Sequence, residues 1–325
     1  MKVVKKMYNN DNIVVSVICL VYNHEKYLRK TLEGFLSQKT SFKYEVLIHD
    51  DCSTDNSVEI IKEYQKRRPD IIKPIFETEN QYSKGVAISR NILAPLAQGR
   101  YLAWCEGDDF WFDENKLQKQ VEFLDSNPEY SMCLHSVRSY NLIDKTVGYI
   151  PYLLDDKDYT LEDVLKRGVL FQTSSLVIRK EIYCSMPSCF YSRYFGDYQI
   201  YMYGTMNGKC HVLKDIMSQY NYGVKDSWTD KVHKNKQYNI DSNKSMYELL
   251  EKIDEYYNKK YTDLIQTAKD RAEFNILYLS GDKVKLKQKK FKKLLFRQKL
   301  LIIREKYPWL AKIKRFFVKI GIWRT

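Results

Sequence analysis

Long hydrophobic runs are missing from this sequence of 325 residues, and their absence limits the class of protein. No stretch reaches the 18 or so consecutive apolar residues that a membrane-spanning helix needs. Met1–Lys6 lacks the apolar core and the small-residue cleavage site of a secretory signal peptide. With 29% charged and 44% hydrophobic residues, the composition excludes an integral membrane protein and suffices for a buried core. We therefore expect a folded protein located in the cytoplasm.

Paired cysteines are missing as well. The seven cysteines are scattered, and none belongs to a Cys-x-x-Cys pair of the kind that binds zinc or carries out redox chemistry. Cys19 and Cys105 lie within apolar runs, where cysteine behaves as a small hydrophobic residue. We expect reduced thiols without a role in catalysis.

Acidic residues are almost missing from the C-terminal end. Residues 283–325 contain 16 Lys or Arg and the single acid Glu305, a charge of +15, so residues 1–282 carry 13 − 15 = −2. This distribution favours attraction of the C-terminal end to an anionic surface over a protein whose whole surface binds nucleic acid. Apolar residues recur there at helical spacing with basic residues opposite, which predicts an amphipathic helix at a membrane surface or, alternatively, a helix packed on the body. The apolar positions are Trp309, Leu310, Ile313, Phe316, Phe317 and Ile320.

The first 115 residues alternate between strand and helix patterns. Ile13–Tyr22 is a nearly continuous β-branched run, which is typical of a strand buried on both faces of a parallel sheet. Such alternation favours right-handed crossovers and a doubly wound α/β sheet. The further predicted strands are Tyr44–His49, Ile71–Phe76 and Tyr101–Cys105, with helices between them, the third over Gly85–Gln98 with Gly99 as its C-cap.

Polar residues follow three of these strands. Tyr22 ends the first, Asp50 and Asp51 follow the second, and the run Glu106–Asp109 follows the fourth. Ligands of open α/β sheets bind beyond the carboxyl ends of the strands, so these residues should meet at one edge. Asp50 and Asp51 could contact the base or ribose of a nucleotide, although Ser53, which follows them, also suits a simple helix cap.

The run Glu106-Gly-Asp-Asp109 offers three carboxylates around a glycine that lets the backbone turn. Two of their oxygens could reach one hard cation such as Mg²⁺ or Mn²⁺. A nucleotide sugar needs such a cation, because its leaving diphosphate gains charge as the bond to the sugar breaks. A solvated acidic loop is the alternative interpretation.

Three motifs in this order identify a resemblance. The segments Ser16–Asn23, Asp50–Asp55 and Gly99–Trp111 resemble the inverting family 2 glycosyltransferases, over about residues 13–230. The resemblance implies an α/β, GT-A type fold with a doubly wound, mostly parallel sheet. It places the catalytic domain at 1–235, with a nucleotide-sugar half at about 1–115 and an acceptor half at about 116–235. A helical, basic extension would follow at 236–325.

The resemblance also implies roles for residues near the nucleotide. Asp51, with Asp50 as the alternative, would contact the base. Tyr22 and Glu25 would line the nucleoside pocket, and Arg90 would lie near the diphosphate.

At the reacting centre, Glu106 and Asp108 match the outer acids of the family's metal motif, which implies Mn²⁺ or Mg²⁺ as cofactor. Asp197, within Phe195-Gly-Asp-Tyr198, matches the family's general base and would take the proton of the acceptor hydroxyl; a helix N-cap is the alternative. The other residues implied to contact substrate are Glu106, Asp109, Trp111 and Thr173.

One segment departs from the family pattern. Relatives with an acidic Glu-Gly-Asp-Asp run often have Tyr-Arg-x-His followed by Trp, whereas this chain has Tyr220-Asn-Tyr-Gly223 and then Trp228. Gly223 stands where the histidine would be, so a third protein ligand to the metal is in doubt, with His233 as a distant candidate.

We therefore expect an inverting, metal-dependent glycosyltransferase that uses a nucleotide-diphosphate sugar with UDP as the nucleotide. The acceptor would be a hydroxyl of a lipid-linked or cell-surface polysaccharide precursor, as in capsule or lipopolysaccharide synthesis, and the enzyme would sit at the inner face of the cell membrane. A nucleotidyltransferase is the alternative enzyme, although the Gly-rich basic phosphate loop usual there is missing. A nucleic-acid-binding protein using Lys283–Lys319 is the alternative outside enzymes, but no nucleic-acid partner is expected.

Overall fold

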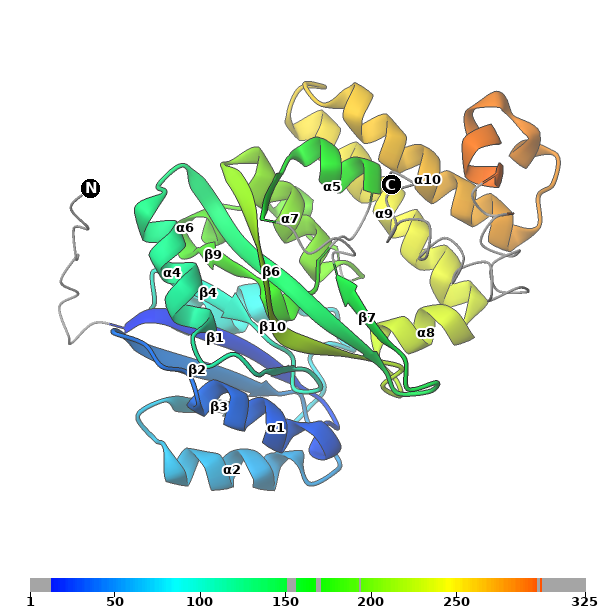
Figure 1. Ribbon diagram of the computed structural model, residues 1–325. Helices are drawn as coiled ribbons and strands as arrows, with labels where there is room; N and C mark the ends of the chain where they lie inside the picture. Colours follow the sequence, from blue (N-terminus) through cyan, green and yellow to red (C-terminus); the bar gives the residue numbers. More distant parts are fainter. Residues whose placement is uncertain (1–12, 151–155, 168–170, 193, 297–298, 300–325) are drawn as a thin grey trace, which may run out of the picture.

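A single mixed sheet of ten strands runs through the protein (Figure 1). The structure is a computed structural model that describes residues 13–150, 156–167, 171–192, 194–296 and 299. The main path of the sheet has the order β3-β2-β1-β4-β9-β6-β10-β5, with β7 paired to β6 and β8 to β10. The strands are β1 (Ile13–Val21), β2 (Lys43–Asp50), β3 (Ile72–Phe76), β4 (Tyr101–Trp104), β5 (Phe110–Trp111), β6 (Tyr130–Asn141), β7 (Val147–Ile150), β8 (Lys157–Tyr159), β9 (Val177–Arg179) and β10 (Lys209–Tyr222).

The first four strands run parallel, as the sequence predicts. β1 lies between β2 and β4, with Val17 opposite both Val46 and Ala103. Its residues are buried almost throughout, which explains the run without alternation. β3 lies at the edge of the sheet, where Pro74 costs no ladder hydrogen bond on the open side.

The later strands make the sheet mixed. β9 pairs antiparallel with both β4 and β6, whereas β6 and β10 run parallel along most of their length. The two-residue strand β5 pairs antiparallel with β10, which brings the acidic run before it to the end of β10. The predicted α/β, GT-A type architecture is therefore confirmed, with parallel pairing concentrated in the first half.

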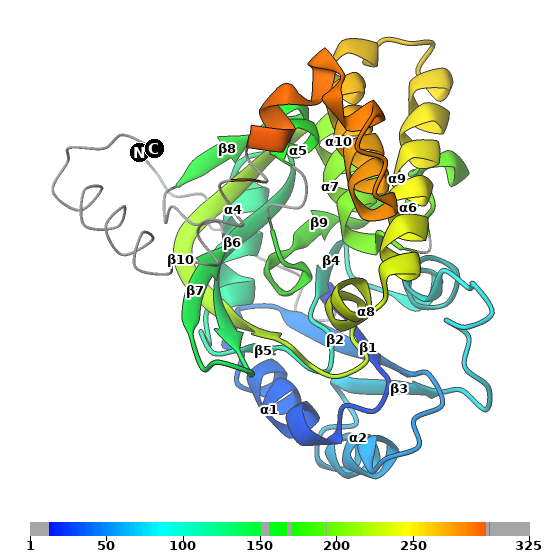
Figure 2. The same cartoon turned by 90° about the vertical axis from the view of Figure 1, so that its right-hand side faces the viewer.

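Helices cover both faces of the sheet and bury a core on each (Figures 1 and 2). One core joins the sheet to α1, α2 and α4, and the other joins it to α5, α6, α7, α9 and α10. The helices are α1 (Glu25–Leu36), α2 (Ser57–Arg67), α3 (Ala94–Leu96), α4 (Lys116–Ser126), α5 (Leu161–Arg167), α6 (Lys180–Cys184), α7 (Gly196–Met206), α8 (Trp228–Lys234), α9 (Lys236–Tyr256) and α10 (Thr262–Ser280).

The helix predicted over Gly85–Gln98 is largely wrong. Only a π-helical turn, Ser89–Leu93, and the short α3 form there. Gly85 has a φ of +80° and belongs to a loop, which a regular helix could not accommodate. Gly99 is not a left-handed C-cap either: a Cβ there would lie 2.5 Å from the backbone nitrogen of Ser16, so its role is close approach to β1.

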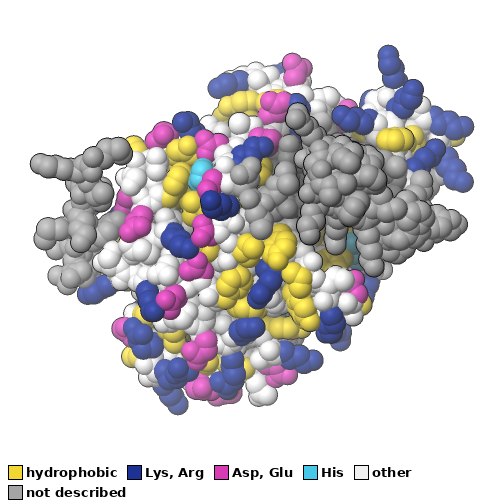
Figure 3. Space-filling model, viewed as in Figure 1, with side chains coloured by type: hydrophobic (Ala, Val, Ile, Leu, Met, Phe, Trp, Pro, Cys, Tyr) yellow, Lys and Arg dark blue, Asp and Glu magenta, His cyan; other side chains and the backbone are white. Residues whose placement is uncertain are grey.

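The C-terminal helices extend the core of the body. Leu249, Leu250 and Ile253 of α9 pack in the same core as α5 and α7, so this part of the predicted extension is not a separate body. After α10, Leu286 and Phe291 pack on Phe274, and exposed lysines gather over this segment (upper right in Figure 3). The amphipathic helix predicted from Trp309 onward lies outside the described residues. Within the described part, no helix is both long and apolar enough to cross a membrane.

Candidate active site

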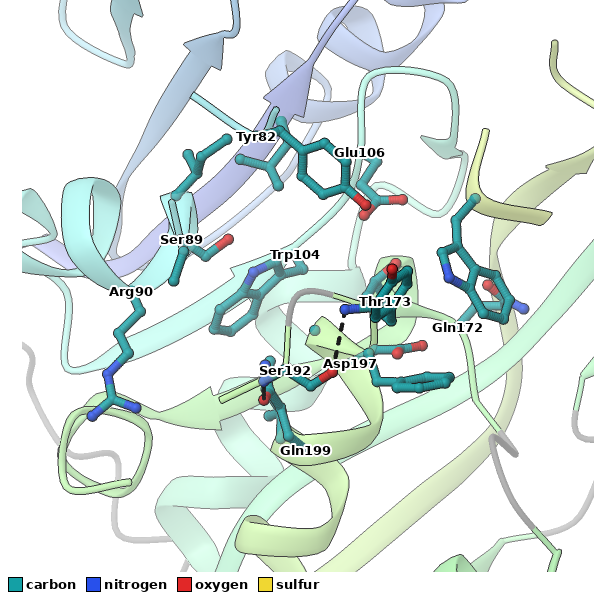
Figure 4. Close-up of a pocket in the computed structure, with 18 of the residues that line it drawn as sticks. Tyr82, Ser89, Arg90, Trp104, Glu106, Gln172, Thr173, Ser192, Asp197 and Gln199 are labelled. Atoms are coloured by element: carbon teal, nitrogen blue, oxygen red, sulfur yellow. Dashed lines mark hydrogen bonds between the residues drawn. The ribbon is translucent and has the colours of Figure 1, made fainter. Parts of the chain in front are cut away.

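A pocket of about 390 Å³ lies beyond the carboxyl ends of β1 and β4 (Figure 4). Glu106 and Asp108 line it from the loop after β4, and Asp197 lines it from the first turn of α7. Thr173 reaches it from the turn before β9. The structure thus brings together both predicted metal ligands, the predicted base and one predicted acceptor-side residue.

Hydrogen bonds from two distant elements hold the acidic loop. Thr31 of α1 donates its hydroxyl proton toward the carbonyl oxygens of Gly107 and Asp109, at 3.0 and 2.6 Å. At the other side, Asp109 Oδ1 accepts from the backbone N–H of Asn221 at 2.8 Å, and Asn221 Nδ2 donates to the Asp108 carbonyl at 2.6 Å. Asp109 is buried and ties the loop to β10, so its carboxylate does not line the pocket.

The pocket concentrates negative charge. Burial, followed by the charges of Asp108 and Asp197, raises the pKa of Glu106 to about 8. Burial also raises the pKa of Asp197. No three His, Cys, Asp or Glu side chains within the described ranges are grouped to hold a metal on their own. Glu106 and Asp108 still fit a hard divalent cation, because their oxygens are the ligands it prefers and a diphosphate would complete its shell.

Asp197 stands at the N-terminal end of α7, partly exposed to the pocket. Its Oδ1 accepts from the backbone N–H of Tyr198 at 2.7 Å. Figure 4 shows its carboxylate beside Thr173. It is well situated to receive a proton from a molecule in the pocket.

Trp111 connects β5 with the turn that carries Thr173. Its indole is buried, and Nε1 donates to the Ser174 carbonyl at 2.8 Å. Ser174 follows Thr173, so the turn that carries Thr173 is tied to β5, which directly follows the acidic loop. Trp111 does not line the pocket, and its place is structural support.

The carboxylates predicted to meet the nucleotide base are engaged with the backbone. Asp51 accepts from the N–H groups of Gln81 and Tyr82 at 2.7 and 3.0 Å. Asp50 Oδ1 accepts from Ser53 N–H at 2.9 Å, while its buried Oδ2 has no partner in the described part of the chain. Asp51 thereby shapes the loop that carries Tyr82 over the pocket, and neither aspartate lines the pocket itself.

Tyr22 and Glu25 also lie outside the pocket lining. Tyr22 is 45% exposed, and Glu25 Oε2 accepts from the Asn56 N–H at 3.0 Å. Together with the bond from Glu25 N–H to Asp55, this joins the loop after β1 to the loop after β2.

Arg90 lines the pocket, but its guanidinium is already bound. It donates to the carbonyl oxygens of Met186 and Pro187 at 2.6 and 3.3 Å. In Figure 4 it points away from Glu106. A second hydrogen bond, from the Tyr191 hydroxyl to the Gly85 carbonyl at 2.8 Å, joins the same two segments of the chain, the one before β4 and the one after α6.

The pocket has further residues that the sequence analysis missed. Aromatic side chains dominate its walls and rim, and no spacing pattern marks them because they come from separate strands, helices and loops. Outside the pocket lining, His24 Nε2 lies 3.9 Å from Asp108 Oδ2, whereas His233 meets the hydroxyl of Tyr222 at 2.9 Å. In the sequence, the position of His24 beside Asn23 at the end of β1 was the available signal for a residue near the site. The aromatic residues are Tyr82, Trp104, Tyr183, Tyr191, Tyr194, Phe195, Tyr220 and Trp228.

Comparison with known proteins agrees with the family resemblance that the sequence motifs indicate. The profile of the family described as Glycosyl transferase family 2 matches residues 16–183. An uncharacterized protein of Mycobacterium tuberculosis is 34% identical over 215 residues, which are 66% of this chain and 60% of that protein. The chain thus spans 60% of the length of this relative.

Two further matches have names that describe chemistry. The Escherichia coli protein WfaP, named UDP-Glc:alpha-D-GlcNAc-diphosphoundecaprenol beta-1,3-glucosyltransferase, is 36% identical over 113 residues, covering 35% of this chain and 42% of WfaP. Among solved structures, S. aureus TarS in complex with UDP-GlcNAc has a TM-score of 0.57 at 18% identity, covering 83% of this chain and 80% of that one. At this identity the likeness to TarS shows the fold.

Proposed function

The chain belongs to glycosyl transferase family 2, and from that membership we propose that it transfers a sugar from a UDP-sugar to an acceptor hydroxyl with inversion. The observation that carries the proposal is the meeting of Glu106, Asp108 and Asp197 in one pocket at the carboxyl ends of the strands. The UDP-GlcNAc complex of TarS and the UDP-glucose donor in the name of WfaP support the choice of nucleotide.

On the donor side, Glu106 and Asp108 would hold Mn²⁺ or Mg²⁺, which neutralises the charge of the departing diphosphate when it is bound. The loop that carries them is fixed by Thr31 and Asn221. A fixed loop costs little reorganisation during the reaction, and this is what makes electrostatic stabilisation effective. Asp51 contributes indirectly, because it orders the loop of Tyr82.

On the acceptor side, Asp197 takes the proton of the acceptor hydroxyl as that oxygen attacks the anomeric carbon. The new bond joins the acceptor oxygen to the sugar, and the bond between the sugar and the diphosphate breaks on the opposite face. The electron pair leaves with the nucleoside diphosphate, so the configuration at the anomeric carbon inverts. Holding both partners in one pocket converts this displacement into an effectively unimolecular step.

The acceptor that we propose is a glycan or lipid-linked glycan of a cell-surface polysaccharide. Tyr82, Tyr191 and Trp228 are 39%, 37% and 39% exposed at the rim, and aromatic faces suit the apolar faces of sugar rings. The lipid-linked substrate in the name of WfaP supports this class. The basic C-terminal end would bring the enzyme to the anionic inner surface of the membrane.

A direct test is a screen of nucleotide sugars for hydrolysis and transfer, with and without Mn²⁺. We expect one UDP-sugar to be consumed only with the metal, and Asp108→Asn to lose most turnover while circular dichroism shows an intact fold. Full activity in EDTA would contradict the metal requirement. Consumption of nucleoside triphosphates instead of nucleotide sugars would identify a nucleotidyltransferase.

A further inference from the structure

Tyr201 lies on the same helix as the proposed base and on the same face. It follows Asp197 by four residues on α7, which is about one helical turn. Aromatic side chains on a helix point back toward its N-terminus. The phenol ring of Tyr201 is therefore directed toward the turn that carries Asp197, and it is 0% exposed.

The hydroxyl of Tyr201 is an unused hydrogen-bond donor. It is buried and has no partner among the described residues. Its two tyrosine neighbours on α7 differ: the hydroxyl of Tyr198 donates to the Val164 carbonyl at 3.4 Å, and that of Tyr203 donates to the Ser185 carbonyl at 3.0 Å. A buried hydroxyl without a partner destabilises a fold, and phenylalanine would fill the same space without that loss.

The ring of Tyr201 cannot easily turn its hydroxyl elsewhere. It packs edge-on against Phe171, with ring centroids 5.3 Å apart and planes at 78°. Phe171 is held in turn by Tyr159, at 4.9 Å and 90°. Phe171 directly precedes Gln172 and Thr173 in the pocket wall, so the ring is fixed between α7 and the acceptor-side turn.

Tyr201 also keeps its proton. Burial, followed by the charge of Asp197, raises the pKa of Tyr201 well above its usual value. A matching acceptor is present: within the described part of the chain, Asp197 Oδ1 accepts from the neighbouring Tyr198 N–H, and no side chain there donates to the carboxylate. Its Oδ2 therefore has capacity for a donor.

We propose that Tyr201 is a positioning residue for Asp197: its hydroxyl donates to the Asp197 carboxylate when that group turns toward the acceptor hydroxyl. The bond would leave one carboxylate oxygen free for the incoming proton and fix its direction. This inference rests on the proposed transfer reaction and adds a second residue of α7 to the acceptor side of that site.

The test compares two tyrosine-to-phenylalanine variants on one helix. Tyr201→Phe should lower kcat about 10-fold, as loss of a supporting hydrogen bond commonly does, while the KM for the nucleotide sugar and the metal affinity stay near wild type. Its Tm should equal or exceed that of the wild type. Tyr203→Phe, which loses a hydrogen bond away from Asp197, should show a lower Tm and a wild-type kcat.

Tyr201→Phe should thus lower kcat without lowering Tm, whereas Tyr203→Phe should lower Tm without lowering kcat. A Tyr201→Phe protein with wild-type kcat, or one whose kcat and Tm fall together as in a general loss of packing, would overturn the inference. Wild-type protein that transfers no sugar while Asp197 is intact would overturn the proposed function itself, and the inference with it. If the wild type and Tyr203→Phe transfer sugar at the same kcat and Tyr201→Phe has a lower kcat with an undiminished Tm, both the proposed function and the inference are supported.

Discussion

At the scale of single residues, the surroundings of a carboxylate decide its task. Asp51 has both oxygens bound by backbone N–H groups, so it shapes a loop. Asp197 accepts a hydrogen bond from the Tyr198 N–H with one oxygen and faces the pocket, so it can exchange a proton. The sequence shows that both are acids at the ends of elements. It cannot show that the backbone partners of Asp51 lie 30 residues away, so the loop-shaping role of this carboxylate becomes visible only in the structure.

Asp197→Asn should separate binding from chemistry. An amide cannot accept the acceptor proton, so we expect kcat to fall by about 10² to 10⁴, the usual contribution of a general base. The donor dissociation constant, measured by calorimetry, should change little. Retention of more than about a tenth of wild-type transfer would mean that another group is the base, and Asp215 or Asp226 would be tested next.

Lys116 of α4 is a buried lysine that the sequence analysis did not single out. Its side chain is 0% exposed, Nζ donates to Gln120 Oε1 at 2.7 Å, and it lies 4.1 Å from the centre of the Trp111 ring. Burial lowers the pKa of Lys116 from 10.5 to about 7. The amine is therefore neutral in the folded protein over much of the range in which it is charged in the unfolded chain.

The resulting pH dependence has a definite sign. Between pH 7 and 10.5 the unfolded state binds the extra proton, so the contribution of Lys116 to the free energy of unfolding rises with pH, by on the order of 5 kcal/mol over the window. In urea unfolding near pH 7, the Lys116→Met variant should be more stable than the wild type. The difference between their free energies of unfolding should shrink toward pH 10. Lys119→Met, at a half-buried site on the same helix where the lysine pairs with Asp113 and Asp215, is the control. A constant difference between Lys116→Met and wild type would contradict a depressed pKa.

At the scale of elements, the strands with local signals were predictable. β1 is a nearly continuous apolar run and β2 contains the apolar segment Val46–Ile48, and both strands are buried almost throughout. β6 and β10 pair across about 80 intervening residues, and their pairing depends on partners that no local window contains. The helix predicted over Gly85–Gln98 failed for a similar reason: Asp51 holds the loop just before this segment, at Gln81, and Tyr191 bonds to Gly85 at its start.

Gly99 offers a test of how closely a loop approaches β1. A Cβ at this position would lie within 2.5 to 2.8 Å of the backbone of Val15 and Ser16, which are in the middle of the sheet and cannot move. We expect Gly99→Ala to lower the free energy of unfolding by about 3 kcal/mol. Gly148→Ala is the matched control, since a Cβ there meets nothing within 4 Å. Equal unfolding midpoints in urea for the two variants would show that the loop relaxes.

At the scale of the whole molecule, charge is distributed as the sequence predicts. The basic segment, residues 283–296, contains seven lysines and no acid, and all seven are exposed (Figure 3). Val284 and Phe296 are 81% and 63% exposed among them. Lys285 and Lys290 have acidic neighbours on α10 or just after it. A basic surface with exposed apolar residues suits an anionic lipid surface.

Charge reversal in this segment should weaken membrane attachment without loss of fold. The triple variant Lys287→Glu, Lys289→Glu, Lys293→Glu should lose about 3 kcal/mol of attraction to anionic vesicles, roughly a hundred-fold in binding. Sedimentation with phosphatidylserine vesicles measures this binding. The control is a second triple variant in which three exposed lysines elsewhere are changed to Glu: Lys26, Lys43 and Lys66. Truncation after Ser280 would be a less clean test, because it would uncover Phe274. Equal sedimentation of both triple variants would indicate that this segment is not the attachment surface.

The bonds that join the two halves of the site end on main-chain carbonyls. Arg90 reaches Met186 and Pro187, and Tyr191 reaches Gly85. A carbonyl is present whatever the side chain, so the residues that receive these bonds can be exchanged without breaking the connection. The loops around the pocket are therefore free to diversify while the frame stays constant, which makes them suitable positions for libraries that aim to change the sugar in the proposed transfer.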